Sequence, residues 1–144
     1  MGKYIETKVS YDKILENGVN KRVSEPYLVD AVSFTEAEAR ITEEVSPFIS
    51  GEFSVSAVKK SNISELFLDA DGDRWYKVKV AFITMDEKSG AEKRKASYIL
   101  VQASSFKEAY DNFVEGMKGT VADYEIASIT ETAIMDVYLA KPAE

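Results

Sequence analysis

The chain of 144 residues has no cysteine and no histidine. Without them it cannot form a thiolate or imidazole metal site, a thiol nucleophile, an imidazole acid–base relay, a haem ligand of either type or a disulfide. Any chemistry must use carboxylates, lysine, tyrosine, serine or threonine. The sequence pattern also does not indicate a serine nucleophile with a lysine base or a glycine-rich phosphate loop. We therefore expect no catalytic residue, no cofactor and no metal, and not an enzyme.

Long hydrophobic runs are missing as well. Nowhere do about 18 apolar residues follow one another, as a membrane span requires. The first residues, MGKYIETKVSYDKI, contain no apolar core of a signal peptide. We expect a cytoplasmic protein that contacts no membrane.

Negative charge predominates, with 25 acidic against 18 basic residues and a net charge of −7. This balance lowers the expectation of unspecific binding to nucleic-acid backbones, although it allows a local basic face. Hydrophobic residues make up 45% of the chain, which is too many for a disordered segment. The length fits one domain over residues 1–144.

The second half of the chain repeats the first, from about 3–70 to about 74–140. The segment 4–11 corresponds to 75–82, Leu28-Val29 to Leu100-Val101, and Ser33-Phe34 to Ser105-Phe106. Such agreement in pattern and order over a whole chain indicates an internal duplication.

Each repeat predicts the order strand, strand, helix, strand, short strand. The first two strands form a hairpin, because alternating residues flank loops with Asn17-Gly18 or Ser89-Gly90. Each helix begins at a capping box, Ser33-x-x-Glu36 or Ser105-x-x-Glu108. The apolar residues expected to pack each helix on its sheet are Phe34, Ala37, Ile41 and Val45 in the first repeat, and Phe106, Ala109, Phe113 and Met117 in the second.

This pattern predicts an α+β fold. We expect a two-layer sandwich with a largely antiparallel sheet, pseudo-twofold symmetry between the repeats, and both helices on one side of a continuous sheet. A partly closed barrel with the helices outside and a cleft between the halves is the alternative.

Basic residues gather in the second hairpin, where Arg74 to Tyr98 contain seven of them against three acidic residues. Together with an aromatic ring they could line a groove for single-stranded nucleic acid. The candidate residues are Trp75, Lys77, Lys79, Lys93, Arg94 and Lys95. The alternative is a solvated sheet face, on which lysine discourages pairing between sheet edges.

Two carboxylate features point to structural roles. Asp69-Ala70-Asp71-Gly72-Asp73 resembles a calcium loop, but Arg74 and Val80 stand where such a loop needs glycine and a bidentate glutamate. We expect a polar turn whose aspartates cap backbone groups. Asp30 lies inside an apolar strand, and its counterpart Gln102 indicates a polar group satisfied within the sheet.

Three segments, 25–39, 49–53 and 71–79, carry a resemblance along nearly the whole chain. They are similar to a family of short uncharacterised proteins, a domain of unknown function typical of Bacteroides-type gut bacteria and their phages or mobile elements. The resemblance implies a bacterial intracellular protein and assigns no activity or functional residue.

Taken together, the sequence favours a non-catalytic binding or interaction module with a site between the two repeats, whose partner is an unknown protein or a small ligand. The alternative is a single-stranded nucleic-acid-binding accessory protein that uses the basic hairpins. A monomer is plausible, because the duplicated chain already contains the two halves that a homodimer would bring together.

Overall fold

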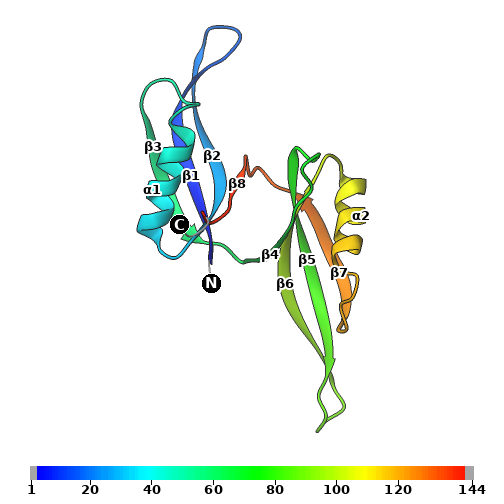
Figure 1. The fold of residues 1–144 in the computed structure, drawn as a ribbon. Coiled ribbons are helices and arrows are strands. Elements are labelled where there is room, and N and C mark those ends of the chain that lie inside the picture. Colours follow the sequence, from blue (N-terminus) through cyan, green and yellow to red (C-terminus); the bar gives the residue numbers. More distant parts are fainter. Residues whose placement is uncertain (1–2, 142–144) are drawn as a thin grey trace. The chain divides into compact units, whose positions relative to one another are not determined.

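The computed structural model describes residues 3–141. Helices and strands follow the order that the repeats predict (Figure 1). They are β1 (Lys3–Ile14), β2 (Asn20–Ala31), α1 (Phe34–Val45), β3 (Phe53–Lys60), β4 (Ile63–Phe67), β5 (Arg74–Met85), β6 (Glu92–Ala103), α2 (Phe106–Gly116), β7 (Asp123–Glu131) and β8 (Val137–Tyr138).

The strands form two four-stranded sheets, in the orders β3-β1-β2-β8 and β4-β6-β5-β7. All neighbours are antiparallel except β8 beside β2 and β4 beside β6. Helix α1 packs on the first sheet and α2 on the second (Figure 1). The α+β class and the duplicated unit are thus confirmed. The single continuous sheet with both helices on one side was wrong, because the strands form two separate sheets and each helix packs on a different one.

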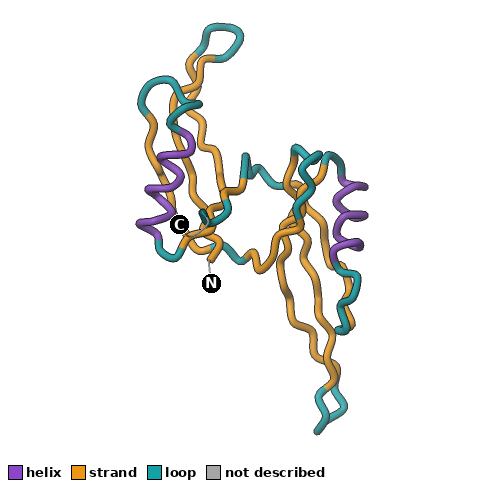
Figure 2. The backbone as a smooth tube through the Cα atoms, in the orientation of Figure 1, coloured by secondary structure: helices purple, strands orange, loops and turns teal. Residues whose placement is uncertain are grey.

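The two short strands are exchanged between the repeats. Strand β4 belongs to the first repeat in sequence but pairs with β6 of the second. Strand β8 belongs to the second repeat but pairs with β2 of the first. Accordingly, the chain forms two compact units (Figure 2). The first combines residues up to Ser61 with those from Ala133 onward, and the second comprises Asn62–Thr132.

Both helices begin at the predicted caps. The Ser33 and Ser105 hydroxyls accept hydrogen bonds from the backbone N–H groups of Glu36 and Glu108, at 3.1 and 3.2 Å. The carboxylate of Glu36 accepts from the N–H of Val32, one residue before the cap, and that of Glu108 does the same at Ser104. The caps therefore satisfy N–H groups that the first helical turn leaves without partners.

The helix residues that were expected to pack on the sheets do so with two exceptions. Ala37, Ile41 and Val45 are buried in the core of the first unit, and Ala109, Phe113 and Met117 in that of the second. Phe34 and Phe106 were predicted to join them but are 53% and 59% exposed. Each is the first residue of its helix, directly after the cap, where the chain has just left the end of a strand.

Each exchanged strand delivers an aromatic ring to the helix of the other repeat. The ring of Phe67 lies 6.0 Å from that of Phe113, centroid to centroid. A Cβ atom at Gly116 would meet the Phe67 ring at 2.6 Å, so glycine permits this close approach to α2. In the first unit, the guanidinium of Arg40 on α1 lies 5.8 Å from the centroid of the Tyr138 ring, which also stacks on Tyr27 of β2 at 6.0 Å.

Phe67→Ala is expected to lower the free energy of unfolding by about 2 kcal/mol, less than for a fully buried phenylalanine, because Phe67 is half-buried. The loss should fall on the second unit, although Phe67 belongs to the first repeat. Amide hydrogen exchange tests this, with Phe53→Ala, a half-buried phenylalanine of the first unit, as the matched control. Equal loss of protection in both units, or loss confined to the first, would contradict the assignment of β4.

Candidate interaction surfaces

The predicted nucleic-acid residues divide between the two faces of the second sheet. Alternate residues of β5, among them Val78 and Val80, face α2. Trp75, Lys77 and Lys79 therefore lie on the face away from α2. The pairing of β5 with β6 then gives the faces of the other three candidates, because paired residues lie on the same face. Arg94 pairs with Ile83 and lies on the face away from α2. Lys93 and Lys95 pair with Thr84 and Phe82 and lie on the α2 face.

Several of the predicted nucleic-acid-binding residues are buried or already form ion pairs. Trp75 is only 5% exposed. Arg94 donates to both carboxylate oxygens of Glu125, at 2.6 and 3.4 Å. This hydrogen-bonded pair lowers the pKa of Glu125 and raises that of Arg94. Lys93 lies 3.6 Å from the carboxylate of Asp86. The indole is thus not available to stack on a base, and two of the cations already have acidic partners.

Lys77 and Lys79 remain as neighbouring cations on the face away from α2. Lys79 is exposed, and Lys77 is half-buried. The ammonium group of Lys77 lies 4.9 Å from the ring centroid of Tyr98, within the range of a cation–π interaction. Sequence analysis did not single out Tyr98, although the hairpin register places it directly opposite Lys79.

The aspartate-rich turn is held by hydrogen bonds of the kind expected. One carboxylate oxygen of Asp69 accepts from the N–H of Asp71 at 3.1 Å, and the other accepts from the Asn112 amide at 3.0 Å. Gln102 accepts from the N–H of Asp69 and donates to the carbonyl of Gly72. These bonds fasten the turn to β6 and α2. Among residues 3–141, no cluster of three potential metal-ligating side chains is found.

Asp30 behaves differently from its counterpart Gln102. Its Oδ1 atom is buried and accepts no hydrogen bond within the described part of the chain. The expected satisfaction within the sheet was therefore wrong for this oxygen. A carboxylate can only accept, whereas the Gln102 amide both accepts and donates, so the two side chains cannot hold the same backbone partners.

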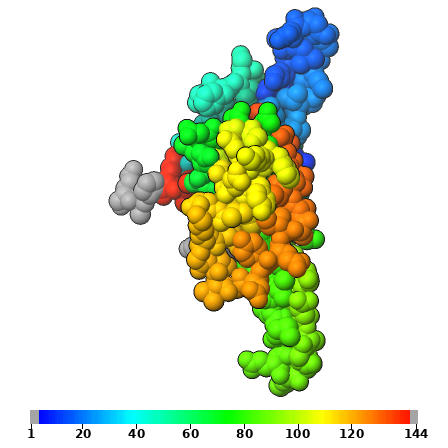
Figure 3. Space-filling view, turned by 90° about the vertical axis from the view of Figure 1, so that its right-hand side faces the viewer, coloured from blue at the N-terminus to red at the C-terminus, as the bar shows by residue number. Residues whose placement is uncertain are grey.

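Helix α2 carries a second apolar stripe, which is exposed. Phe106, Tyr110 and Val114 recur every four residues and are 59%, 47% and 36% exposed. Residues four apart lie above one another on a helix, so the three side chains form one continuous ridge. The yellow residues of α2 face the viewer in Figure 3. We call these three residues the α2 ridge.

Of the α2 ridge, α1 shares only the first residue, Phe34, which is also exposed. At the positions equivalent to Tyr110 and Val114, α1 carries Glu38 and Thr42. Sequence analysis missed the ridge because it followed only the stripe that faces the sheet. The signal was available, since comparing the two helices position by position separates the apolar residues they share from those present in α2 alone.

A groove runs along the other side of α2. It has a volume of about 380 Å³ and lies between the end of β4 and the C-terminal half of the helix. One wall is formed by Leu66, Phe67, Leu68 and Asp69, and the other by Asn112, Glu115 and Gly116 of α2. One wall comes from the first repeat and the other from the second, so the exchange of β4 creates this groove.

In the first unit, a second groove of about 290 Å³ has the same construction. It lies between α1 and the segment after β8, and Arg40, Glu43 and Lys141 line it. The Arg40 guanidinium donates to the carbonyl of Leu139 at 2.9 Å, and Lys141 bonds to Glu43 at 2.9 Å. These two hydrogen bonds join the walls of the groove beside α1, and the Asp69–Asn112 bond joins the walls of the groove beside α2.

Within residues 3–141, no helix is long and apolar enough to cross a membrane. None of the curated proteins and none of the solved structures matches the chain. A family model does match it, over residues 3–140, and its description is a domain of unknown function, DUF4494. Because this match spans nearly the whole sequence, the chain belongs to the DUF4494 family.

Proposed function

We propose that the protein is a non-catalytic interaction module that binds another protein through the α2 ridge and the groove on the other side of α2. The observation that carries this proposal is the exposed apolar ridge of three residues on α2, of which the duplicated helix α1 has only the first. Contiguous apolar surface costs solubility and is typical of interaction sites. The duplication supplies an internal comparison, because α1 has the same place in its unit and carries Glu38 and Thr42 at the positions of Tyr110 and Val114.

The groove supports a site between the two repeats, as the sequence suggested. Its walls come from β4 and α2, and the exposed Leu68 extends its apolar wall. Asp69 at the end of that wall and Glu115 on the α2 wall make the groove acidic. A partner segment with an apolar side chain flanked by lysine or arginine would match both walls.

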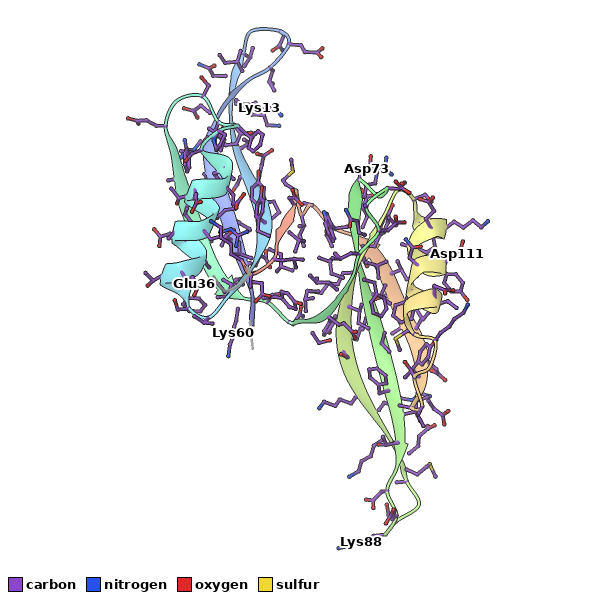
Figure 4. All side chains as sticks on the ribbon, in the orientation of Figure 1. Lys13, Glu36, Lys60, Asp73, Lys88 and Asp111 are labelled. Atoms are coloured by element: carbon purple, nitrogen blue, oxygen red, sulfur yellow. The ribbon has the colours of Figure 1, made fainter. Side chains whose placement is uncertain are left out.

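Charged residues beside the α2 ridge limit how a partner approaches. Lys107 and Asp111 follow the ridge along the exposed side of the helix, and Figure 4 labels Asp111. Such a rim around an apolar centre is the usual arrangement in protein interfaces. The resemblance to short proteins of Bacteroides-type bacteria and their phages makes the cytoplasm of such cells the place to seek the partner.

Site-specific photo-crosslinking in cells that produce the protein tests this proposal. A photoreactive phenylalanine analogue replaces Tyr110 in one variant and Glu38, the equivalent residue of α1, in the control. We expect a discrete crosslinked protein at position 110 and none at position 38. The second change Val114→Asp should abolish the product at position 110. No product at position 110, or the same product at both positions, would overturn the proposal.

A second candidate is single-stranded nucleic-acid binding, and the observation that favours it is the placement of Lys77 and Lys79 on one sheet face with the Tyr98 ring. Binding of a labelled oligonucleotide, followed by fluorescence anisotropy, should weaken steeply between about 50 and 200 mM salt if phosphate contacts drive it. Changing Lys77 and Lys79 to glutamate should abolish binding. The same change at Lys93 and Lys95, on the other face, is the matched control. No binding at the lower salt concentration, or equal loss in both double variants, would contradict this candidate.

A further inference from the structure

The two exchanged strands dock in the same way. Phe67 pairs with Val101 and Leu66 with Leu100, while Tyr138 pairs with Val29 and Val137 with Leu28. Both ladders are parallel, and their receiving residues are equivalent in the duplication. The donors are also alike, since Leu66-Phe67-Leu68 corresponds to Val137-Tyr138-Leu139. One recognition geometry therefore occurs twice: an aliphatic residue opposite leucine and an aromatic residue opposite valine.

In the first unit, the receiving site fixes both backbone and side chain of the donor. The N–H of Met135 donates to the carbonyl of Pro26 at 2.8 Å, and the N–H of Leu28 donates to the carbonyl of Asp136 at 3.1 Å. The Tyr138 ring stacks on Tyr27, and the Arg40 guanidinium lies 5.8 Å from its centroid. Burial, followed by the charge of Asp136, raises the pKa of Tyr138 to about 12, so the phenol stays neutral at physiological pH.

Of the two donors, β8 is held by the shorter ladder. It comprises two residues, whereas β4 comprises five. Val137 and Tyr138 are only half-buried, and residues 132–136 before them belong to no helix or strand. Segments with few buried contacts open at a small free-energy cost, below that of global unfolding. The receiving site on β2 is therefore the first to become vacant.

We propose that a second copy of this chain supplies β8 to the vacant site on β2, so that two chains exchange β8 reciprocally and form a dimer. The same residues then meet in the same register, because the incoming strand has the sequence of the one it replaces. Such exchange is a low-cost route to dimers. At low protein concentration, the β8 strand of the same chain occupies the site on β2. The β8 strand of a second chain competes for that site when the protein concentration approaches the effective concentration of the chain's own β8. This inference does not depend on the proposed function.

The first experiment measures the mass of the unaltered full chain by light scattering after refolding at low concentration and at about 1 mM, comparable with the effective concentration of a short tether. We expect monomer after dilute refolding and a dimer fraction after concentrated refolding. Monomer alone under both conditions would overturn the proposal.

The second experiment identifies the surface that the dimer uses. Because the chain has no cysteine, introduced thiols are the only ones present. Leu28→Cys and Val137→Cys chains, which place one thiol on each side of the β2–β8 ladder, are mixed, refolded together at high concentration and oxidised. We expect a disulfide-linked heterodimer. Ser24→Cys mixed with Val137→Cys is the control, since Ser24 is exposed and lies on β2 beyond the ladder.

Because Leu28 is buried, its cysteine variant could fold poorly, and a second pair of cysteine variants provides an independent test. Pro26→Cys and Met135→Cys lie beside the 2.8 Å hydrogen bond that precedes the ladder. A dimer that gives no heterodisulfide with either pair, or that gives it equally well with the Ser24 control, uses another surface and overturns the proposal.

Discussion

Phe113→Ala is expected to lower the free energy of unfolding of the second unit by about 3–5 kcal/mol, the usual cost of truncating a buried phenylalanine. Phe113 is fully buried and is the largest side chain of that kind in the described part of the chain. Its ring lies 6.0 Å from that of Phe67 and 5.9 Å from that of Tyr124, centroid to centroid. One truncation therefore removes the contact of α2 with strands on both edges of the sheet.

Denaturant unfolding followed by tyrosine and tryptophan fluorescence measures this loss, and hydrogen exchange locates it. Because the free energy of unfolding of a domain is about 5–15 kcal/mol, this loss should leave part of the variant unfolded at the growth temperature of the producing cells. Phe113→Leu keeps an apolar side chain in place and should cost clearly less. A loss below about 1 kcal/mol for the alanine variant, far under the usual range for such truncations, would contradict the packing described here.

Gly72→Ala is expected to lower the free energy of unfolding by about 3 kcal/mol, at the upper end of the usual cost of overpacking. A Cβ atom at Gly72 would lie 2.6–2.8 Å from the backbone N, Cα and C atoms of Ala103. These atoms cannot easily give way, because Ala103 is fully buried and pairs with Arg74 in the sheet. The hydrogen bond from Gln102 to the Gly72 carbonyl holds the other side of the contact at 3.0 Å.

Thermal and denaturant unfolding of this variant should be compared with those of Asp73→Ala. Asp73 is the next residue along the chain and is exposed, so its change should stay within about 0.5 kcal/mol. If Gly72→Ala and Asp73→Ala unfold alike, the turn does not approach β6 as closely as the structure indicates.

The duplication, the hairpins and the helix starts could be read from the sequence because each depends on neighbouring residues. A capping box such as Ser33-x-x-Glu36 acts within one helical turn. Alternation in β1 and β5 likewise predicts which side chains share a face, and it places Lys77 beside Lys79 correctly. These features need no knowledge of which strands pair.

The exchange of β4 and β8 could not be predicted in this way. Alternation records which residues are buried, but not the strand against which they are buried. The two receiving edges carry the same residues, Leu28-Val29 and Leu100-Val101. Either short strand fits either edge on local grounds, so only the complete fold decides between them.

The candidate site was predictable only in part. The strand order puts Trp75 in the sheet, yet its burial depends on the tertiary structure. Lys93 and Lys95 lie on the opposite sheet face from Lys77 and Lys79. The hairpin register, and not the sequence of β6 alone, determines the face on which they lie. The α2 ridge required a comparison between repeats, since an exposed apolar residue alone carries little information.

The interleaved path of the chain also makes the two repeats dependent on each other during evolution. A shortened gene that encoded only the first repeat would retain β1, β2, β3 and α1, but the fourth strand of its sheet would be missing and β4 would have no β6 to join. Loss of either copy thus damages the survivor, in contrast to an ordinary tandem array. Conversely, a chain cleaved between Ser61 and Asn62 would consist of two fragments, the second of which carries the strand that completes the sheet of the first. This connectivity therefore favours the reassembly of the two fragments.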